Sequence, residues 1–377
     1  MHYLDNAATT VVDPELADIC RAAMTELFGN PSSLYTPGAK SEMAIDKARE
    51  QVASTLGVTA AEITFTACGS ESDNIALLGA AKKAKHWATN LVATGFEHPA
   101  VYKTLDALGK EGWEIRFIAP DAEGRISEQA LLDAVDGKTG LVTFMFVNNE
   151  IGTMQDVLGL AQKVRAKAPR AAIHVDGVQG WCKHPLNLKN SAIDSFALSG
   201  HKMHCPKGIG ALYLRKNYKI DPAFCGGGQE RGLRPGTENV PYIVTLGAAA
   251  EKYGSTITRR LAKVKELNQK LRDGLAAIDG VIINSPIDAS PYILNFSIPG
   301  VRSETMLHFL ESKEVYVSSG SACSKGAASH TLAAMGLPPE RIDGALRVSF
   351  CESSQPEDID ALLQGLQEGL ATLARKR

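Results

Sequence analysis

Apolar residues follow two periodicities along the first 256 residues of this chain. Between residues 14 and 28, and again between 40 and 56, they recur at the three- and four-residue intervals of an amphipathic helix. After Gly57, short apolar runs of β-type residues alternate with helix-length amphipathic segments. These runs predict seven strands, at 63–66, 91–94, 115–119, 141–147, 172–175, 195–198 and 209–214. Such an alternation is typical of an α/β fold, with a mainly parallel sheet covered by helices on both faces.

The pattern changes near residue 256. A long charged helix is expected over 257–278, and the strands after it are shorter. They are predicted at 281–284, 293–297, 315–317 and 345–349, followed by terminal helices. We interpret this part as a smaller α+β domain that the N-terminal segment completes. The predicted organisation is a large domain over 14–256 and a small domain made of 1–13 and 257–377.

Composition narrows the class of protein without identifying it. Of the 377 residues, 44% are hydrophobic and 22% are charged, and the formal net charge is -2. This balance is typical of a globular protein and gives no sign of general nucleic-acid binding or of attraction to a membrane. No apolar run approaches the length that spans a bilayer, and the N-terminus lacks the apolar region of a signal peptide. We therefore expect a cytoplasmic protein without direct nucleic-acid or membrane partners.

The seven cysteines are scattered, without Cys-x-x-Cys pairs or the spacing of Cys/His metal ligands. This distribution indicates reduced thiols rather than a disulfide framework or a zinc site. No metal site is predicted.

Polar residues follow several predicted strands at their carboxyl ends, where ligands bind in parallel sheets. They are Ser70, His98, Asn149, Asp176 and Lys202. Their shared placement predicts a single site.

Asp176 and Lys202 end neighbouring strands and together suit one cofactor. A lysine beside small residues at the end of a buried strand can lose its proton and form a Schiff base. Enzymes that use pyridoxal 5'-phosphate (PLP) need such a lysine, and an acid that keeps the pyridinium nitrogen protonated. Gly69 and Ser70 open a helix-like segment whose backbone N–H groups suit a phosphate. Taken singly, Lys202 is typical of a surface lysine and Gly69-Ser70-Glu71 of an ordinary helix cap; together they predict a PLP site.

Ten motifs follow one another along nearly the whole chain: LDNAATT (4–10), GNPSS (29–33), ESDN (71–74), EHPAV (97–101), VNNEIG (147–152), HVDGVQ (174–179), SGHK (199–202), PKGIGALY (206–213), GGGQERGLRPGT (226–237) and SSGSAC (318–323). Their order resembles that of the cysteine desulfurases of the NifS/IscS type. These are fold-type I PLP enzymes of the class V aminotransferase family. The resemblance implies that fold, PLP as the cofactor and a homodimer.

The resemblance also implies roles around the cofactor ring. Lys202 forms the Schiff base, and Asp176 binds the pyridine nitrogen. Gln179 reaches the ring hydroxyl, and Asn149 lies near the ring oxygen and the substrate. His98 stacks over the ring and can also move protons, because imidazole titrates near neutrality. The alternative for His98 is a helix-capping residue before Pro99.

Further residues are implied to bind the cofactor phosphate. Those of the same subunit are Gly69, Ser70, Ser199 and His201. Thr237 reaches the phosphate of the neighbouring subunit, so that only a dimer has complete sites.

Cys323 is the candidate nucleophile for sulfur transfer. It lies among Gly, Ser and Ala between a predicted strand and the next helix, which indicates an exposed loop and not a buried structural position. The resemblance implies that Lys202 removes the Cα proton of L-cysteine, after which the Cys323 thiolate attacks the substrate sulfur. A persulfide on Cys323 and alanine result. Arg347 is implied to bind the substrate carboxylate, a role that suits its planar pair of donors.

Several alternatives stay open at this point. Cys205 stands where the family commonly has Gly, and it is either a second, exposed reactive thiol or a tolerated small residue. Other activities are a selenocysteine lyase or another class V aminotransferase-like enzyme, and a non-enzyme alternative is an inactive scaffold homologue. The sulfur acceptor is expected to be an Fe–S scaffold or a tRNA-thiolation enzyme.

Overall fold

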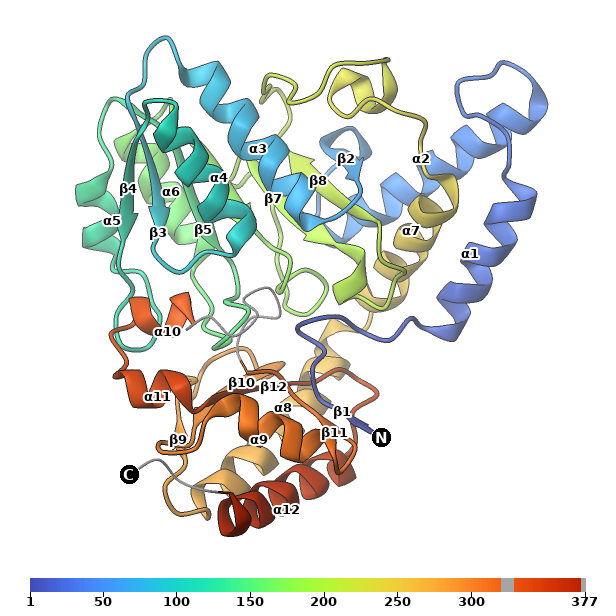
Figure 1. The fold of residues 1–377 in the computed structure, drawn as a ribbon. Helices are drawn as coiled ribbons and strands as arrows, with labels where there is room; N and C mark the ends of the chain where they lie inside the picture. Colours follow the sequence, from blue (N-terminus) through green and yellow to red (C-terminus); the bar gives the residue numbers. More distant parts are fainter. Residues whose placement is uncertain (320–328, 374–377) are drawn as a thin grey trace.

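A seven-stranded sheet lies at the centre of the larger part of the molecule (Figure 1). The computed structural model describes residues 1–319 and 329–373. The strands, in spatial order, are β2 (Ile63–Thr66), β8 (Gly210–Leu214), β7 (Ser195–Ser199), β6 (Ala172–Asp176), β5 (Thr139–Met145), β3 (Asn90–Thr94) and β4 (Glu114–Ile118). Within this sheet β8 runs antiparallel and the other strands share one direction. The predicted α/β class and the seven strands are confirmed, with ends shifted by one or two residues.

Helices cover both faces of this sheet, because neighbouring residues of a strand point to opposite sides. Leu141 belongs to an apolar cluster with residues of α3 (Gly69–Ala84) and α4 (Pro99–Lys110). The next residue, Val142, belongs to a second cluster, with residues of α2 (Thr36–Leu56), α6 (Val157–Lys167) and α7 (Val240–Gly254). Two outer helices, α1 (Pro14–Glu26) and α5 (Glu128–Ala134), pack on α7 and α6. The central strands are therefore buried on both sides.

Two helix boundaries differ from those predicted. The first helix ends at Glu26 and not at residue 28, and the second begins at Thr36, four residues before the expected start. Thr-Pro-Gly-Ala, at 36–39, has the composition of a turn. Pro37 nevertheless occupies the first turn of α2, where a missing backbone N–H costs nothing because no carbonyl of the helix would accept from it.

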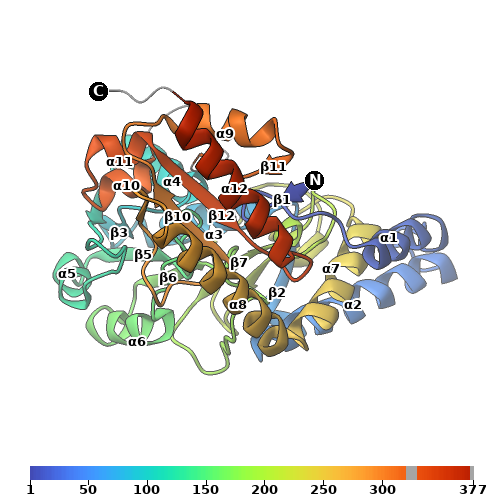
Figure 2. The ribbon, with the colours of Figure 1, turned by 90° about the horizontal axis from the view of Figure 1, so that it is seen from below.

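The second part of the molecule contains a three-stranded antiparallel sheet, in the order β12 (Ala345–Ser349), β10 (Ile293–Ser297) and β9 (Ile282–Ile283). Beside it, α12 (Pro356–Thr372) packs on α8 (Ile257–Ala276) and α9 (Ser303–Glu311) (Figure 2). The N-terminal strand β1 (His2–Tyr3) pairs in parallel with β11 (Val315–Tyr316). The short helices α10 (His330–Ala334) and α11 (Pro339–Asp343) precede β12.

Buried apolar side chains form two large clusters in these two parts. The first takes its members from residues 16 to 253. The second combines Leu4 and Ala7 with residues between 264 and 366. The division into two domains with the predicted boundaries stays a prediction. In the described ranges, no helix combines the length and the apolar character that crossing a membrane requires.

Candidate active site

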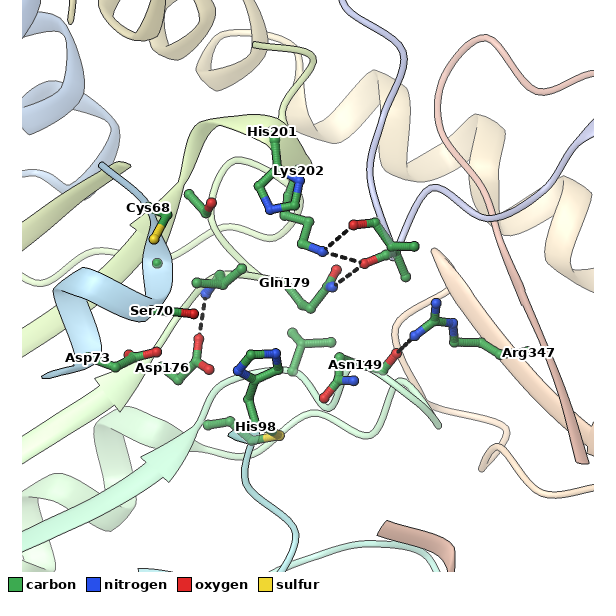
Figure 3. A pocket seen from close by; sticks show the side chains of 17 residues that line it. Cys68, Ser70, Asp73, His98, Asn149, Asp176, Gln179, His201, Lys202 and Arg347 are labelled. Atoms are coloured by element: carbon green, nitrogen blue, oxygen red, sulfur yellow. Dashed lines mark hydrogen bonds between the residues drawn. The ribbon is translucent and has the colours of Figure 1, made fainter. Parts of the chain in front are cut away.

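A cavity of about 200 Å³ opens where the parallel strands of the large sheet end (Figure 3). Its 17 lining residues are Ala7, Ala8, Cys68, Gly69, Ser70, Asp73, His98, Met145, Val147, Asn149, Asp176, Val178, Gln179, Ser199, His201, Lys202 and Arg347. Every predicted site residue except Thr237 and Cys323 is among them. The structure therefore brings the predicted residues together, while their individual roles stay predictions.

Asp176 is the last residue of β6, and its carboxyl group lies in the cavity wall. Only glycine fits at the next position, because a Cβ on Gly177 would lie 1.8 Å from Phe196 Cζ. The chain turns there, and the Val178 N–H donates to Asp176 Oδ1 at 2.9 Å. Burial raises the pKa of Asp176, whereas the nearby His98 and Lys202 lower it. Asp176 is thus a buried acid that a cation in the cavity would keep ionised.

Lys202 lies in the 3₁₀ turn η2 (Gly200–Lys202), directly after β7. Its Nζ donates to the carbonyl oxygens of Ala7 and Ala8, at 2.6 and 2.7 Å. Gly200 allows the turn to pack on β8, because a Cβ there would lie 2.7 Å from Ile209 Cγ2. The N-terminal segment therefore holds the amine at the cavity wall (Figure 3).

His98 occupies the helix-capping position that was considered for it, and its ring also lines the cavity, while stacking over a cofactor ring stays a prediction. It is the N-cap of α4, and its Nδ1 accepts a hydrogen bond from the Ala100 N–H at 3.1 Å. Because Nδ1 accepts, the neutral ring carries its proton on Nε2. Burial lowers the pKa of His98 more than the neighbouring Asp176 raises it, and Lys202 lowers it further. A neutral imidazole in a fixed tautomer therefore lines the cavity opposite Lys202 (Figure 3).

Unused hydrogen-bond donors lie at the start of α3 and the end of β7. Cys68 is the N-cap of α3 and makes no side-chain hydrogen bond to it, so the first N–H groups of the helix keep their donor capacity. The hydroxyl of Ser199 is buried and has no hydrogen-bond partner within the described residues. A Cβ on Gly69 would lie 2.5 Å from Val178 Cγ2, so glycine allows the helix start to approach the Asp176 turn. These groups suit an anion.

His201 completes this group of polar residues. Its Nδ1 lies 3.2 Å from Thr9 Oγ1. Burial, with Lys202 nearby, lowers the pKa of His201 to about 3. The ring is therefore neutral at neutral pH and can donate from one nitrogen only.

Arg347, in β12, reaches the cavity from the second part of the molecule. Its side chain is buried, with an exposed residue fraction of 1%. Nη1 donates to the Asn149 carbonyl oxygen at 2.9 Å, and Nη2 donates to Asp5 Oδ1 at 2.7 Å. Its Nε is buried and has no partner within the described part of the chain. The guanidinium is thus oriented by two fixed oxygens and keeps donor capacity for a further acceptor.

Two predicted residues lie elsewhere. Thr237 is exposed and does not line the cavity. Cys323 lies outside the described residues. The chain on both sides of that segment is attached near the cavity, since Ser318 exchanges backbone hydrogen bonds with Arg347, and Ser329 Oγ donates to Glu150 Oε2 at 2.5 Å.

Buried acids behind the cavity were missed by the sequence reasoning. Asp73 lies in the cavity wall, and its Oδ1 is 3.1 Å from His174 Nε2. Burial raises the pKa of Asp73, and the negative charges of Asp176 and Glu97 raise it further. Burial also raises the pKa of Glu97 to about 8. An acid on the apolar side of a predicted helix, as in Ser-Asp-Asn at 72–74, was the available signal.

The hypothesis that Cys205 is an exposed reactive thiol is wrong. Cys205 is 1% exposed, and burial raises the pKa of its thiol. Its Sγ lies 3.8 Å from the Thr245 carbonyl oxygen, on the side of α7. It packs as a small apolar residue, which is the other interpretation. The six cysteines of the described ranges are all free thiols.

Comparison with known proteins agrees with these observations. The family model described as "Aminotransferase class-V" matches residues 2–362. A cysteine desulfurase of Trichormus azollae is 40% identical over 370 residues, which are 97% of this chain and 92% of that protein.

Solved structures give the same result. A structure described as a NifS-like protein superposes with a TM-score of 0.93 at 36% identity, covering 98% of this chain and 99% of the other. A structure described as SspA in complex with cysteine has a TM-score of 0.83 at 32% identity, covering 94% and 100%. The chain therefore belongs to the class V aminotransferase family and, within it, to the NifS- and IscS-like cysteine desulfurases.

Proposed function

We propose that this protein is a cysteine desulfurase that converts L-cysteine to L-alanine and transfers the sulfur to Cys323 as a persulfide. The observation that carries this proposal is a single cavity lined by Lys202, Asp176, His98 and Arg347. The relatives named cysteine desulfurase support it, because the similarity covers nearly the whole chain.

The residues present fit PLP. Lys202 supplies an amine for the aldehyde of the cofactor, and Asp176 supplies a buried carboxylate for its ring nitrogen. The uncapped start of α3 and the unpaired Ser199 hydroxyl suit its phosphate. Gln179 and His98 would lie beside the ring. When bound, PLP supplies an electron sink for the charge that develops on the substrate Cα.

Lys202 and His98 are the groups that can move protons. Lys202 Nζ takes the proton from the substrate Cα and can return it to carbon. His98 is neutral because burial lowers its pKa, so its Nε2–H can donate a proton. Once Nε2 has given up its proton, it can accept one. Burial raises the pKa of Asp176, and a protonated cofactor ring nitrogen beside it would keep its carboxyl group ionised.

Arg347 orients the substrate by its carboxylate. Its Nη1 and Nη2 are already held by Asn149 and Asp5, so the plane of the guanidinium is fixed before the substrate arrives. Its unpaired Nε and the remaining N–H groups suit a carboxylate, which accepts two parallel hydrogen bonds. A relative solved in complex with cysteine supports an amino acid of this size as the substrate.

Cys323 takes the sulfur in a step that needs no external oxidant. Its thiolate forms an S–S bond with the substrate sulfur while the C–S bond breaks, and the electron pair of that bond passes to carbon, which gains a proton. Ser318, five residues before Cys323 in the sequence, exchanges backbone hydrogen bonds with Arg347, which lines the cavity. A reducing compartment such as the cytoplasm keeps this thiol free.

The acting molecule is a homodimer that passes its persulfide sulfur to an acceptor protein, either an Fe–S scaffold or a tRNA-thiolation enzyme. The exposed position of Thr237 outside its own cavity is compatible with a contact to the neighbouring subunit.

Turnover with L-cysteine tests the proposal. Wild-type protein loaded with PLP and supplied with L-cysteine and a reductant should form sulfide and alanine in equal amounts. Cys323→Ala should form neither at more than about one hundredth of the wild-type rate, because a missing nucleophile typically costs at least that factor. Both products are measured in the same samples.

Cys225 offers a matched control, because it is an exposed free thiol that does not line the cavity. Cys225→Ala should retain the wild-type rate. Undiminished alanine formation by Cys323→Ala would refute the persulfide step.

A further inference from the structure

A second lysine, Lys183, is buried behind the cavity. It lies in the turn after β6 and is 5% exposed. Its Nζ donates to Gln179 Oε1 at 3.1 Å and lies 5.6 Å from the centre of the Tyr292 ring. Within the described residues it has no carboxylate at ion-pair distance. A buried ammonium without a counter-ion is costly, so its presence calls for a specific role.

Lys183 determines which end of the Gln179 amide faces the cavity. An ammonium group donates hydrogen bonds and accepts none, so the amide atom that faces Lys183 must be the oxygen. The amide nitrogen then points the other way, and Gln179 Nε2 donates to the Ala7 carbonyl oxygen at 2.9 Å. An NH₂ group has a second hydrogen, which is available to the cavity that Gln179 lines.

The same hydrogen bonds connect Lys183 to Lys202. The Ala7 carbonyl oxygen accepts from Gln179 Nε2 and also from Lys202 Nζ. The two lysines are therefore linked through one amide side chain and one carbonyl group. Burial lowers the pKa of Lys183 to about 8, which agrees with an ammonium held in a site without an acid.

We propose that Lys183 is a positioning residue that fixes Gln179 as a hydrogen-bond donor toward the cofactor and thereby lowers the proton affinity of the Lys202 nitrogen. The inference rests on the proposed function, because it concerns PLP bound through Lys202. A hydrogen bond from Gln179 to the ring oxygen would stabilise the negative charge on that oxygen. The oxygen would then attract the proton on the Lys202 nitrogen less strongly. The positive charge of Lys183 acts in the same direction.

The test is a pH titration of the visible absorbance of the PLP-loaded protein, which reports protonation of the Lys202 nitrogen without any turnover. Lys183→Met removes the charge and keeps the length of the side chain. We expect the titration midpoint to rise by about one pH unit, the size of shift that a single lost charge or hydrogen bond produces. Lys189→Met removes the same charge from an exposed site and should leave the midpoint unchanged.

Gln179→Leu provides a second variant that does not depend on how Lys183→Met folds. It should raise the midpoint as well. The double variant should shift the midpoint by less than the sum of the two single shifts, because the two residues act largely through one contact. A midpoint in folded, PLP-loaded Lys183→Met equal to that of the wild type would overturn the inference, as would an additive double variant. A wild type that gains no visible absorbance with PLP would instead overturn the proposed function.

Discussion

At the scale of single residues, burial holds several ionisable groups of the large-sheet part away from their ordinary pKa. Histidines illustrate the effect, because burial lowers the pKa of His174, His184 and His201 alike. Acids move in the opposite direction, as Glu97 does. Burial thus favours the neutral form of each of these groups.

His184 gives a prediction for stability against pH. Burial lowers the pKa of His184 to about 4. Its Nε2 lies 2.7 Å from Ser290 Oγ. A histidine in an unfolded chain has its ordinary pKa of about 6.5. As the pH falls from 6.5 to 4, the unfolded state takes up a proton that the folded state does not, so stability is lost in that window.

His184→Gln should remove this loss and keep a hydrogen bond to Ser290. The slope of unfolding free energy against pH should become smaller by up to about 1.4 kcal/mol per pH unit between pH 6.5 and 4. Urea unfolding at a series of pH values measures the slope. Parallel curves for wild type and His184→Gln would contradict the prediction.

At the scale of elements, buried ion pairs fix segments that have little secondary structure. The 3₁₀ turn η3 (Gln229–Gly232) carries Glu230 and Arg231 at φ values of 46° and 58°, which are unfavourable for residues other than glycine. Glu230 accepts from both terminal nitrogens of Arg49, at 2.7 and 2.9 Å, and from the Phe65 N–H at 3.0 Å. This carboxylate therefore holds the segment leading to Thr237 against α2 and β2.

Glu230→Ala should lower the unfolding free energy by about 3–5 kcal/mol, because it leaves the partly buried Arg49 without its partner. Asp106→Ala removes one acid of an exposed pair with Lys110 and should cost about 0.5 kcal/mol or less. Both values come from denaturant unfolding. If the two substitutions prove equally mild, the Arg49–Glu230 pair does not hold the segment.

The periodicity of the sequence was sufficient to predict the helices and strands, but it could not predict buried charged contacts such as that of Arg49 with Glu230. The seven strands of the sheet were predictable because each is a short apolar run bounded by turns. The start of α2 was not, since Pro37 and Gly38 are typical of a turn and only the packing of Gly38 under the Ser33 carbonyl oxygen explains the helix there. Lys183 and Asp73 were missed for a related reason: a charge inside the core is recognisable only when its surroundings are known.

At the scale of the whole molecule, both parts of the chain contribute residues to the wall of the cavity. Lys202 and Asp176 belong to the part with the large sheet, whereas Ala7 and Arg347 belong to the part with the small one. The motifs predicted a single site from the carboxyl ends of the strands. They did not predict that the N-terminal segment supplies carbonyl oxygens to Lys202, because backbone acceptors leave no mark on a sequence.

PLP should therefore stabilise the whole chain and not one part of it. A ligand present at 100 times its dissociation constant adds about 2.7 kcal/mol to the unfolding free energy. Denaturant unfolding of loaded and PLP-free protein measures this difference. Lys202→Ala, which loses the covalent attachment, should gain much less from the same concentration of PLP. Identical midpoints for loaded and PLP-free wild type would contradict the prediction.

The N-terminal segment has a consequence for how the protein is made. Asp5 pairs with Arg347, the Ala7 N–H donates to Ser349 Oγ and His2 pairs with Asp358. Each partner leaves the ribosome more than 340 residues after the residue that it holds. The large sheet can form while translation continues, since domains fold as units from the N-terminus. The pocket cannot, so a nascent chain has no place for its coenzyme until the strand that carries Arg347 has been synthesised.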